Sequence, residues 1–144
     1  MRFTTFCALI LTLVMAAACG GNDAAPSGVD IPALQVLDRT TGAGADATSG
    51  RLVTVHYTGW LYSTTAAGNK GTQFDSSRDR NQPFSFPLGT GQVIRGWDQG
   101  LLGMRVGGVR TLMIPSSLAY GSAGRGSIPP NSALVFDIEL LAVQ

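Results

Sequence analysis

The segment FDSSRDRNQPFSFPLGTGQVIRGW, residues 74–97, carries the pattern that decides the fold. Phe84 and Phe86 alternate around Ser85, which is typical of a strand that presents its rings to one face. The glycines that follow Leu88 then break this strand, because glycine tolerates backbone angles that other residues resist. The segment therefore predicts an aromatic strand that ends in a tight glycine turn.

A short helix is expected directly after this turn. Ile94, Trp97 and Leu101 recur at i, i+3 and i+7, so a helix would place all three side chains on one side. That side presents a large indole to whatever the sheet places opposite it. We therefore expect a sheet that curls around one helix, with Trp97 as an aromatic floor.

The rest of the chain supplies strand patterns. Residues 52–58 and 109–114 alternate and are rich in β-branched side chains, and residues 134–140 alternate with their acidic residues outward. Residues 34–37 form a weaker strand pattern, and residues 59–71 are predicted to be a surface connection. The predicted fold class is α+β, with an antiparallel sheet of about five strands wrapped around one short helix.

The composition limits the classes of function. The chain has 144 residues, enough for one domain, with ten basic and nine acidic residues. This balance gives no polyanion-binding surface, so we expect no nucleic-acid partner. Nineteen glycines and seven prolines, with few charges, favour a loop-rich β protein over a helical bundle.

Residues 1–18 have the organisation of an export signal peptide. Arg2 gives a positive start, residues 6–15 are apolar, and residues 16–18 are the small residues that a signal peptidase requires. The apolar run is shorter than the ~20 residues that span a bilayer. We therefore expect a cleaved signal rather than a transmembrane anchor, and an exported protein.

Cys19 follows the small residues directly and resembles the lipidated cysteine of bacterial lipoproteins. Cys7 lies in the removed segment, so Cys19 would be a lone exported thiol unless an acyl chain occupied it. We expect lipidation at Cys19 and a location in the periplasm or outer membrane. A secreted protein with a free thiol is the alternative. Residues 19–32 are predicted to be a flexible tether, and residues 33–144 the folded domain.

The chain lacks the common motifs of covalent and metal-dependent catalysis. It has one histidine, His56, which is predicted to be structural, and no GxSxG, Walker or GxGxxG motif. We therefore expect neither a metal site nor a cofactor. Asp75 and Asp79 are interpreted as part of a turn in which Arg78 and Arg80 neutralise the two acids.

The candidate site residues are instead aromatic and aliphatic. Each of them taken singly is typical of a core, but together they are unusually aromatic for one small domain, and Asp75 adds a charge. An apolar pocket with a few placed polar groups is how ligand sites are normally built. The candidates are Tyr57, Phe74, Phe84, Val93, Ile94, Trp97, Tyr120, Ile128 and Phe136.

Four segments resemble the FKBP-type peptidyl-prolyl cis–trans isomerases, also called rotamases. They are VHYTGWL, FDSSRDRNQPFSFPLG, QVIRGWDQGLLGMRVGGVRTLMIPSSLAYG and IPPNSALVFDIELL, and they stand in the family order between about Leu34 and Gln144. The resemblance implies a sheet wrapped around a short helix. It also implies a role in protein folding, by non-covalent acceleration of X–Pro isomerisation in exported proteins.

The resemblance assigns roles to individual residues. Trp97 would lie under the proline ring, the Tyr120 hydroxyl and the Ile94 N–H would hold substrate carbonyls, and Arg80 would pair with Asp75 and Tyr57. The implied catalytic residues are Tyr57, Asp75, Trp97, Tyr120 and Phe136, and the implied substrate-binding residues are Phe74, Arg80, Phe84, Val93, Ile94 and Ile128.

The expected partners are proline-containing polypeptide segments, with macrolides as inhibitors and a monomeric protein. Two other functions stay open: a binding module that grips proline segments with incidental turnover, and a macrolide receptor. The sequence departs from common family members in residues 121–127, a loop that looks about one residue shorter and carries Arg125 where histidine is frequent. Leu118 replaces a frequent tyrosine, and residues 61–71 are longer than in the smallest members.

Overall fold

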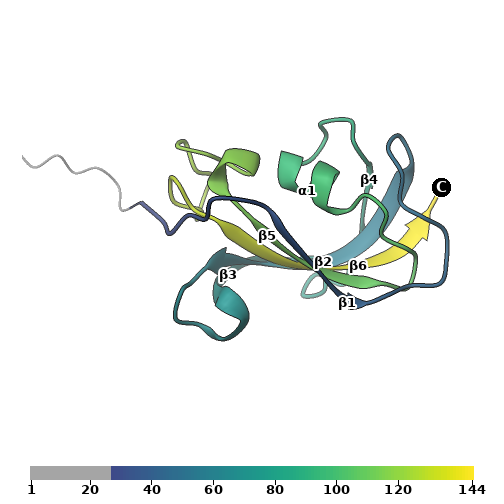
Figure 1. The fold of residues 1–144 in the computed structure, drawn as a ribbon, viewed down its shortest axis with the longest axis horizontal. Coiled ribbons are helices and arrows are strands. Elements are labelled where there is room, and N and C mark those ends of the chain that lie inside the picture. The colour runs from purple at the N-terminus through teal and green to yellow at the C-terminus, as the bar shows by residue number, and fades with distance from the viewer. Residues whose placement is uncertain (1–26) are drawn as a thin grey trace, which may run out of the picture.

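The computed structural model describes residues 27–144, so the predicted signal peptide and Cys19 lie outside the described residues. These residues form an antiparallel sheet with one short helix packed against it (Figure 1). The elements are β1 (Gln35–Thr40), β2 (Leu52–Tyr62), η1 (Ala67–Asn69), β3 (Lys70–Ser76), β4 (Phe84–Pro87), α1 (Arg95–Gly100), β5 (Val109–Ile114), η2 (Ser116–Leu118) and β6 (Leu134–Val143).

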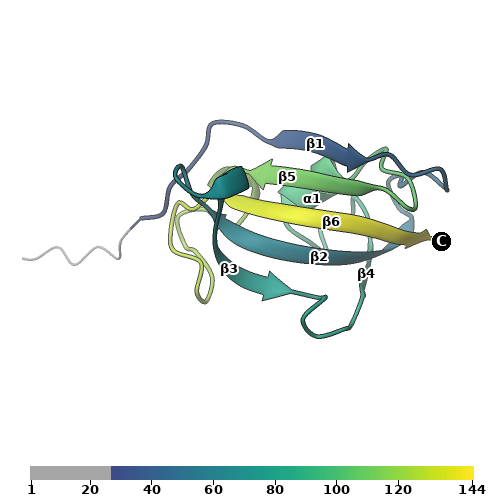
Figure 2. The same ribbon diagram turned by 90° about the horizontal axis from the view of Figure 1, so that it is seen from below.

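The sheet has the strand order β1-β5-β6-β2-β3, and β4 pairs with β2 beside this path. All of these pairs are antiparallel, and the long strands β2 and β6 form the centre (Figure 2). The α+β class and the helix-on-sheet arrangement are confirmed, with six strands where the sequence predicted about five.

The additional strand corrects the prediction for residues 59–71. β2 continues to Tyr62 and β3 begins at Lys70, so the connection between them is residues 63–69. Gly59 reads as a strand breaker in the sequence, but in the structure it pairs with Phe136 of β6. Tertiary pairing therefore overrides the low strand propensity of glycine at this position.

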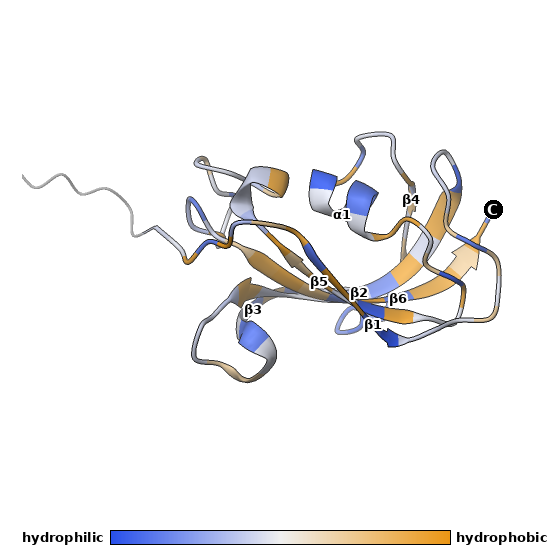
Figure 3. Ribbon diagram, in the orientation of Figure 1, coloured by the Kyte–Doolittle hydropathy of each residue, from blue (hydrophilic) through white to orange (hydrophobic). Residues whose placement is uncertain are grey.

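The core lies between the helix and the inward face of the sheet. Val55 of β2, Leu112 of β5 and Ile138 of β6 are completely buried there. Apolar residues run along β5 and β6 in Figure 3, whereas α1 carries hydrophilic residues at its exposed positions. Among residues 27–144, no helix is long and apolar enough to cross a membrane.

Two glycines allow α1 to lie directly on β5. A Cβ atom added at Gly96 would lie 2.3 Å from Cγ2 of Ile114, and one added at Gly100 would lie 2.8 Å from Cδ1 of Leu112. Real Cβ atoms essentially never approach other heavy atoms this closely. Because these two glycines have no side chain, the helix can approach the sheet this closely, and this approach sets the position of Trp97.

The last part of the predicted tether, residues 19–32, is attached to the domain. The Gly28 N–H donates to the Pro130 carbonyl at 2.9 Å, and the Asp30 carboxylate accepts from both the N–H and the hydroxyl of Ser116. Burial raises the pKa of Asp30, but the Ser116 and backbone hydrogen bonds outweigh it and hold this pKa below its usual value. The ordered fold therefore includes residues 28–30.

Polar side chains from three strands meet on the outward face of the sheet. The Lys70 ammonium pairs with the Asp137 carboxylate and lies 4.6 Å from the centre of the Trp60 ring. The Thr111 hydroxyl donates to the same carboxylate at 2.8 Å. These contacts tie β3, β5 and β6 together on the side opposite the helix.

The close approach of α1 to β5 predicts an unusual response to Gly96→Ala. In the interior of an ordinary helix, replacing glycine by alanine raises the stability of the helix by up to about 1 kcal/mol. Here the added methyl group collides with Ile114, so we expect the free energy of unfolding to fall by about 1–3 kcal/mol. Denaturant unfolding of the variant measures this change.

Gln99→Ala, at an exposed position of the same helix, is the matched control and should change the free energy of unfolding by less than about 0.5 kcal/mol. A Gly96→Ala protein that is more stable than the original would contradict the contact.

Candidate functional site

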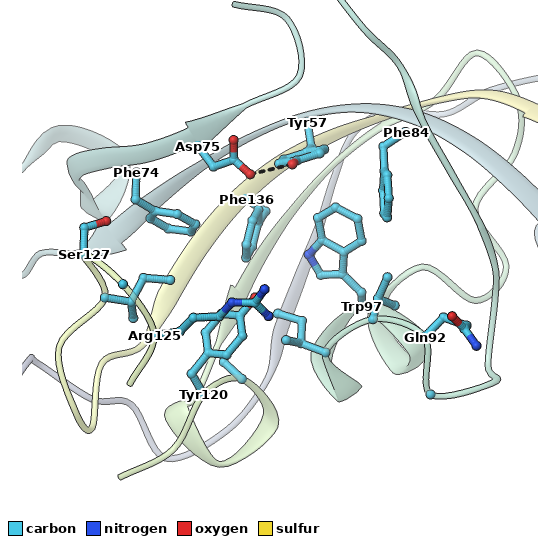
Figure 4. Close-up of a pocket in the computed structure, with 16 residues that line it drawn as sticks. Tyr57, Phe74, Asp75, Phe84, Gln92, Trp97, Tyr120, Arg125, Ser127 and Phe136 are labelled. Atoms are coloured by element: carbon cyan, nitrogen blue, oxygen red, sulfur yellow. Dashed lines mark hydrogen bonds between the residues drawn. The ribbon is translucent and has the colours of Figure 1, made fainter. Parts of the chain in front are cut away.

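A pocket with a volume of about 680 Å³ opens between the sheet, the start of α1 and the loop before β6 (Figure 4). The structure brings ten of the eleven predicted pocket residues together around it, and the eleventh, Arg80, contacts two of them. The ten are Tyr57, Phe74, Asp75, Phe84, Val93, Ile94, Trp97, Tyr120, Ile128 and Phe136.

Aromatic rings from separate elements form the floor of the pocket. Trp97 of α1 is only 4% exposed, and its ring centre lies 5.1 Å from that of Tyr57 and 5.2 Å from that of Phe136. Phe74 of β3 meets Phe136 at 5.6 Å, with the ring planes perpendicular. Edge-to-face pairs of this kind each add about 0.5–1.5 kcal/mol beyond area burial. The floor is therefore a rigid, apolar surface.

Gly59 makes room for two of these rings. A Cβ atom at this position would lie 2.6 Å from Phe74 and 2.7 Å from Phe136. The strand backbone itself thus serves as the surface on which both rings rest. Sequence reasoning missed this role because a glycine inside a strand pattern reads as an interruption.

The indole N–H of Trp97 has no hydrogen-bond partner, and within residues 27–144 it is the sole buried side-chain nitrogen or oxygen in that condition. Buried donors are normally paired, because an unpaired one loses its hydration without compensation. The Trp97 indole N–H is therefore a hydrogen-bond donor in the pocket floor that bonds to no described protein atom.

One edge of the pocket carries a connected polar triad. The Tyr57 hydroxyl donates to the Asp75 carboxylate at 2.5 Å, and the Arg80 guanidinium donates to that carboxylate and, at 3.1 Å, to the Tyr57 oxygen. Arg80 therefore makes the contacts that the resemblance implied. The interpretation of the neighbouring pair was wrong: Arg78 pairs with Glu139 of β6, while Asp79 accepts from the Gln73 amide.

The triad stabilises opposite protonation states in its two acidic members. Burial, followed by the nearby Asp75 carboxylate, raises the pKa of Tyr57 above 10.0. Burial also acts to raise the pKa of Asp75, but hydrogen bonds from Tyr57 and Arg80 and the charge of Arg80 together hold it below 3.8. At neutral pH the edge is therefore a neutral phenol on an ionised carboxylate that is matched by one guanidinium.

Two further donors face the pocket without a protein partner. Within the described part of the chain, the Ile94 N–H makes no backbone or side-chain hydrogen bond, and the same holds for the Tyr120 hydroxyl. Both residues line the cavity, so a ligand in the cavity can reach both groups.

Asp98 holds the loop that leads to Ile94, and sequence reasoning missed it. Its carboxylate accepts from the Gly89 N–H at 2.8 Å and from the Gly91 N–H at 3.0 Å. Both glycines have φ of +77°, a conformation that side-chain-bearing residues rarely adopt. The signal was present as an acid in the first helical turn after a glycine pair, but the sequence does not show which amides it meets.

The described residues hold neither a cluster of metal-ligating side chains nor a histidine at the pocket. Among residues 27–144 no cluster of histidine, cysteine, aspartate and glutamate is arranged to hold a metal ion. His56 lies outside the pocket, with its Nδ1 atom 2.9 Å from the Ser77 hydroxyl. The pocket offers an apolar floor, a polar edge and free hydrogen-bond donors.

The shifted pKa of Asp75 predicts an acid-sensitive contribution to stability. A carboxylate whose pKa is lower in the folded protein than in the unfolded chain stabilises the fold above its unfolded pKa, and this contribution disappears as the pH falls through the folded pKa. We expect Asp75→Asn to lower the free energy of unfolding at neutral pH, and this effect to shrink progressively as the pH falls below about 3.9, the ordinary pKa of an aspartate in an unfolded chain. Denaturant unfolding across this range measures the difference.

The control is Asp79→Asn, an exposed carboxylate on the same turn that forms no salt bridge within residues 27–144. Its effect on the free energy of unfolding should be below about 0.5 kcal/mol. An Asp75→Asn effect of equal size at both ends of the pH range would contradict the pKa assignment.

The sequence matches known proteins over most of its length. A family model described as FKBP-type peptidyl-prolyl cis-trans isomerase matches residues 44–141. An FK506-binding protein of Neisseria meningitidis is 50% identical over 111 residues, which are 76% of this chain and 95% of the relative. The peptidyl-prolyl cis-trans isomerase Fkbp12 of Drosophila melanogaster is 50% identical over 113 residues, 77% of this chain and 98% of the relative.

Solved structures agree with these matches. The crystal structure of AtFKBP13 superimposes with a TM-score of 0.67 at 40% identity and covers 81% of this chain and 98% of that protein. FkpA from Escherichia coli gives a TM-score of 0.67 at 42% identity and covers 77% of this chain, which corresponds to 48% of FkpA. The chain therefore belongs to the FKBP-type peptidyl-prolyl cis–trans isomerases and is an enzyme of that type.

Proposed function

We propose that the pocket above Trp97 isomerises X–Pro bonds without a covalent step, by stabilising the twisted imide. One observation carries this proposal: four aromatic side chains, three of them buried and Phe74 partly buried, form the bottom of a cavity that is open to solvent. A proline ring is apolar and compact enough to lie on such a surface, while the flanking backbone stays at the polar edge.

The physics of the bond explains why an apolar pocket suffices. Rotation about a peptide bond faces a barrier of about 18–20 kcal/mol, because resonance gives the C–N bond partial double-bond character. The planar imide is the most charge-separated form, and twisting reduces that separation. A poorly solvating pocket therefore disfavours the planar ground state relative to the twisted transition state, and only such a differential effect accelerates the reaction.

The polar groups have the task of holding the substrate while the bond turns. The free Ile94 N–H and the Tyr120 hydroxyl are available to bind carbonyl groups on either side of the proline. The Asp75–Arg80 pair fixes the Tyr57 ring against Trp97. Catalysis then needs positioned donors and a dry floor but no nucleophile.

The same pocket is proposed to bind macrolides such as FK506 as inhibitors. The support is the identity of about one half to relatives named as FK506-binding proteins. The pocket is complete within one chain, so catalysis there would not need a second copy, and we also propose that the protein acts as a monomer. A binding module with incidental turnover is the second function, and its distinguishing property would be peptide binding without acceleration.

Tyr120→Phe tests the proposed role of the hydroxyl. The change removes one hydrogen bond to a substrate carbonyl and keeps the ring, so we expect kcat/KM on a short X–Pro peptide to fall about two- to tenfold. A protease-coupled isomerisation assay measures it. Tyr62→Phe, a tyrosine outside the pocket, is the control and should leave turnover unchanged. Equal turnover by both variants would contradict the role of the Tyr120 hydroxyl.

We also propose that the protein is exported and is anchored to a bacterial membrane by a lipid at Cys19, in the periplasm or outer membrane. The support is the sequence of residues 1–18, with its positive start, apolar run and small residues directly before the cysteine. An anchor there would lie nine residues before Gly28, whose N–H bonds to the Pro130 carbonyl of the domain.

Mass spectrometry of the processed protein tests this proposal. We expect the mature chain to begin at Cys19 and to carry acyl chains, and the protein to partition into a detergent phase. Cys19→Ser should move it to the aqueous phase while leaving isomerase turnover intact. A mature chain that begins elsewhere, or a free Cys19 thiol, would contradict the proposal.

A further inference from the structure

Two charged side chains line the pocket, Asp75 and Arg125, and their surroundings differ. Asp75 is matched by the Arg80 guanidinium and by the Tyr57 hydroxyl. None of the five salt bridges among residues 27–144 includes Arg125. The uncompensated charge at the mouth of the pocket is therefore the single positive charge of Arg125.

The backbone around Arg125 is fixed by a tight loop. The Arg125 N–H donates to the Ile128 carbonyl at 3.0 Å, and the Ile128 N–H donates back to the Arg125 carbonyl at 2.8 Å. The flanking residues Gly124 and Gly126 have φ of +64° and +54°, which allows the chain to reverse on both sides. Ile128 is itself buried in the wall of the pocket, so the loop is attached directly to the site.

The Arg125 side chain is directed into the mouth of the pocket. Its guanidinium carbon lies 5.6 Å from the centre of the Tyr120 ring, within the range of a cation–π contact. In Figure 4 the guanidinium extends over Tyr120 towards the space in front of Trp97. Stacking on one face of the guanidinium leaves its N–H donors free to bind an anion at the edge.

We propose that Arg125 gives this enzyme a preference for proline segments in which an acidic side chain adjoins the proline. This inference rests on the proposed function of the pocket, since it concerns which peptide the pocket selects. A proline on the Trp97 floor places its neighbouring residues at the rim, where Arg125 and Tyr120 lie. A carboxylate there meets a guanidinium that forms no salt bridge with any acid among the described residues.

The preference should be modest and sensitive to salt. Arg125 is exposed, and exposed ion pairs contribute little, equivalent to about a two- to fivefold change in kcat/KM. A lysine in place of the acid should be disfavoured by a similar factor. The Debye screening length falls from about 10 Å at 0.1 M salt to about 3 Å at 1 M. High salt should therefore remove most of the difference in turnover between the acidic and the neutral peptides.

The test compares peptides that differ at one position. Glu-Pro, Gln-Pro and Lys-Pro peptides, and the matching Pro-Glu, Pro-Gln and Pro-Lys series, are assayed by NMR exchange, which needs no helper protease. We expect the protein to convert the glutamate peptide about two- to fivefold faster than the glutamine peptide in one series. The series that shows the difference identifies the side of the proline that meets Arg125.

The test variant is Arg125→Gln and the matched control is Arg51→Gln. Each substitution removes one positive charge. Arg51 is exposed, outside the pocket and in none of the five salt bridges. We expect Arg125→Gln to reduce the glutamate-to-glutamine ratio to about one, and Arg51→Gln to retain it.

Equal turnover of glutamate and glutamine peptides by the unaltered protein, or a ratio that survives Arg125→Gln, would overturn this inference and leave the proposed function standing. A protein that accelerates none of the peptides would overturn the proposed function, and the inference would fall with it.

Discussion

The rest of the structure depends on the contact between α1 and β5, where Gly96 and Gly100 let the helix rest on the sheet. This contact sets the height of Trp97, and the indole in turn receives the rings of Tyr57 and Phe136. Because aromatic pairs have preferred distances and angles, a displaced helix would alter the contacts that Trp97 makes with the other rings of the floor. The packing of a six-residue helix thus controls the shape of the whole site.

The site separates two physical tasks between its floor and its edge. In the proposed mechanism, the aromatic floor solvates the planar imide poorly, while the donors around it, the Ile94 N–H and the Tyr120 hydroxyl, retain the peptide backbone. The Asp75–Arg80 pair lies at this boundary, and its charges are matched, so the edge adds polarity with little net charge. Arg125 breaks that balance at the mouth of the pocket, where a substrate side chain would lie.

The sequence was informative wherever a local pattern reflects the structure. The alternation around Ser85 predicted β4, and the spacing of Ile94, Trp97 and Leu101 predicted a helix that buries Trp97. The helix is shorter than this spacing implies, because Ile94 and Leu101 lie at its two caps and Ile94 is only partly buried. The resemblance to a family placed the pocket residues. The close approaches of Gly59 and Gly96, and the cap that Asp98 provides for the preceding loop, could not be predicted. Those roles arise between distant segments, and in the sequence a glycine reads only as a break.

The most direct test of the account is to measure isomerase turnover while the pocket is filled stepwise with FK506. If the surface above Trp97 performs the reaction, turnover should fall in proportion to the occupied fraction and reach the uncatalysed rate when one equivalent is bound. Turnover that persists in the fully occupied protein would show that catalysis takes place elsewhere, and would contradict the central claim.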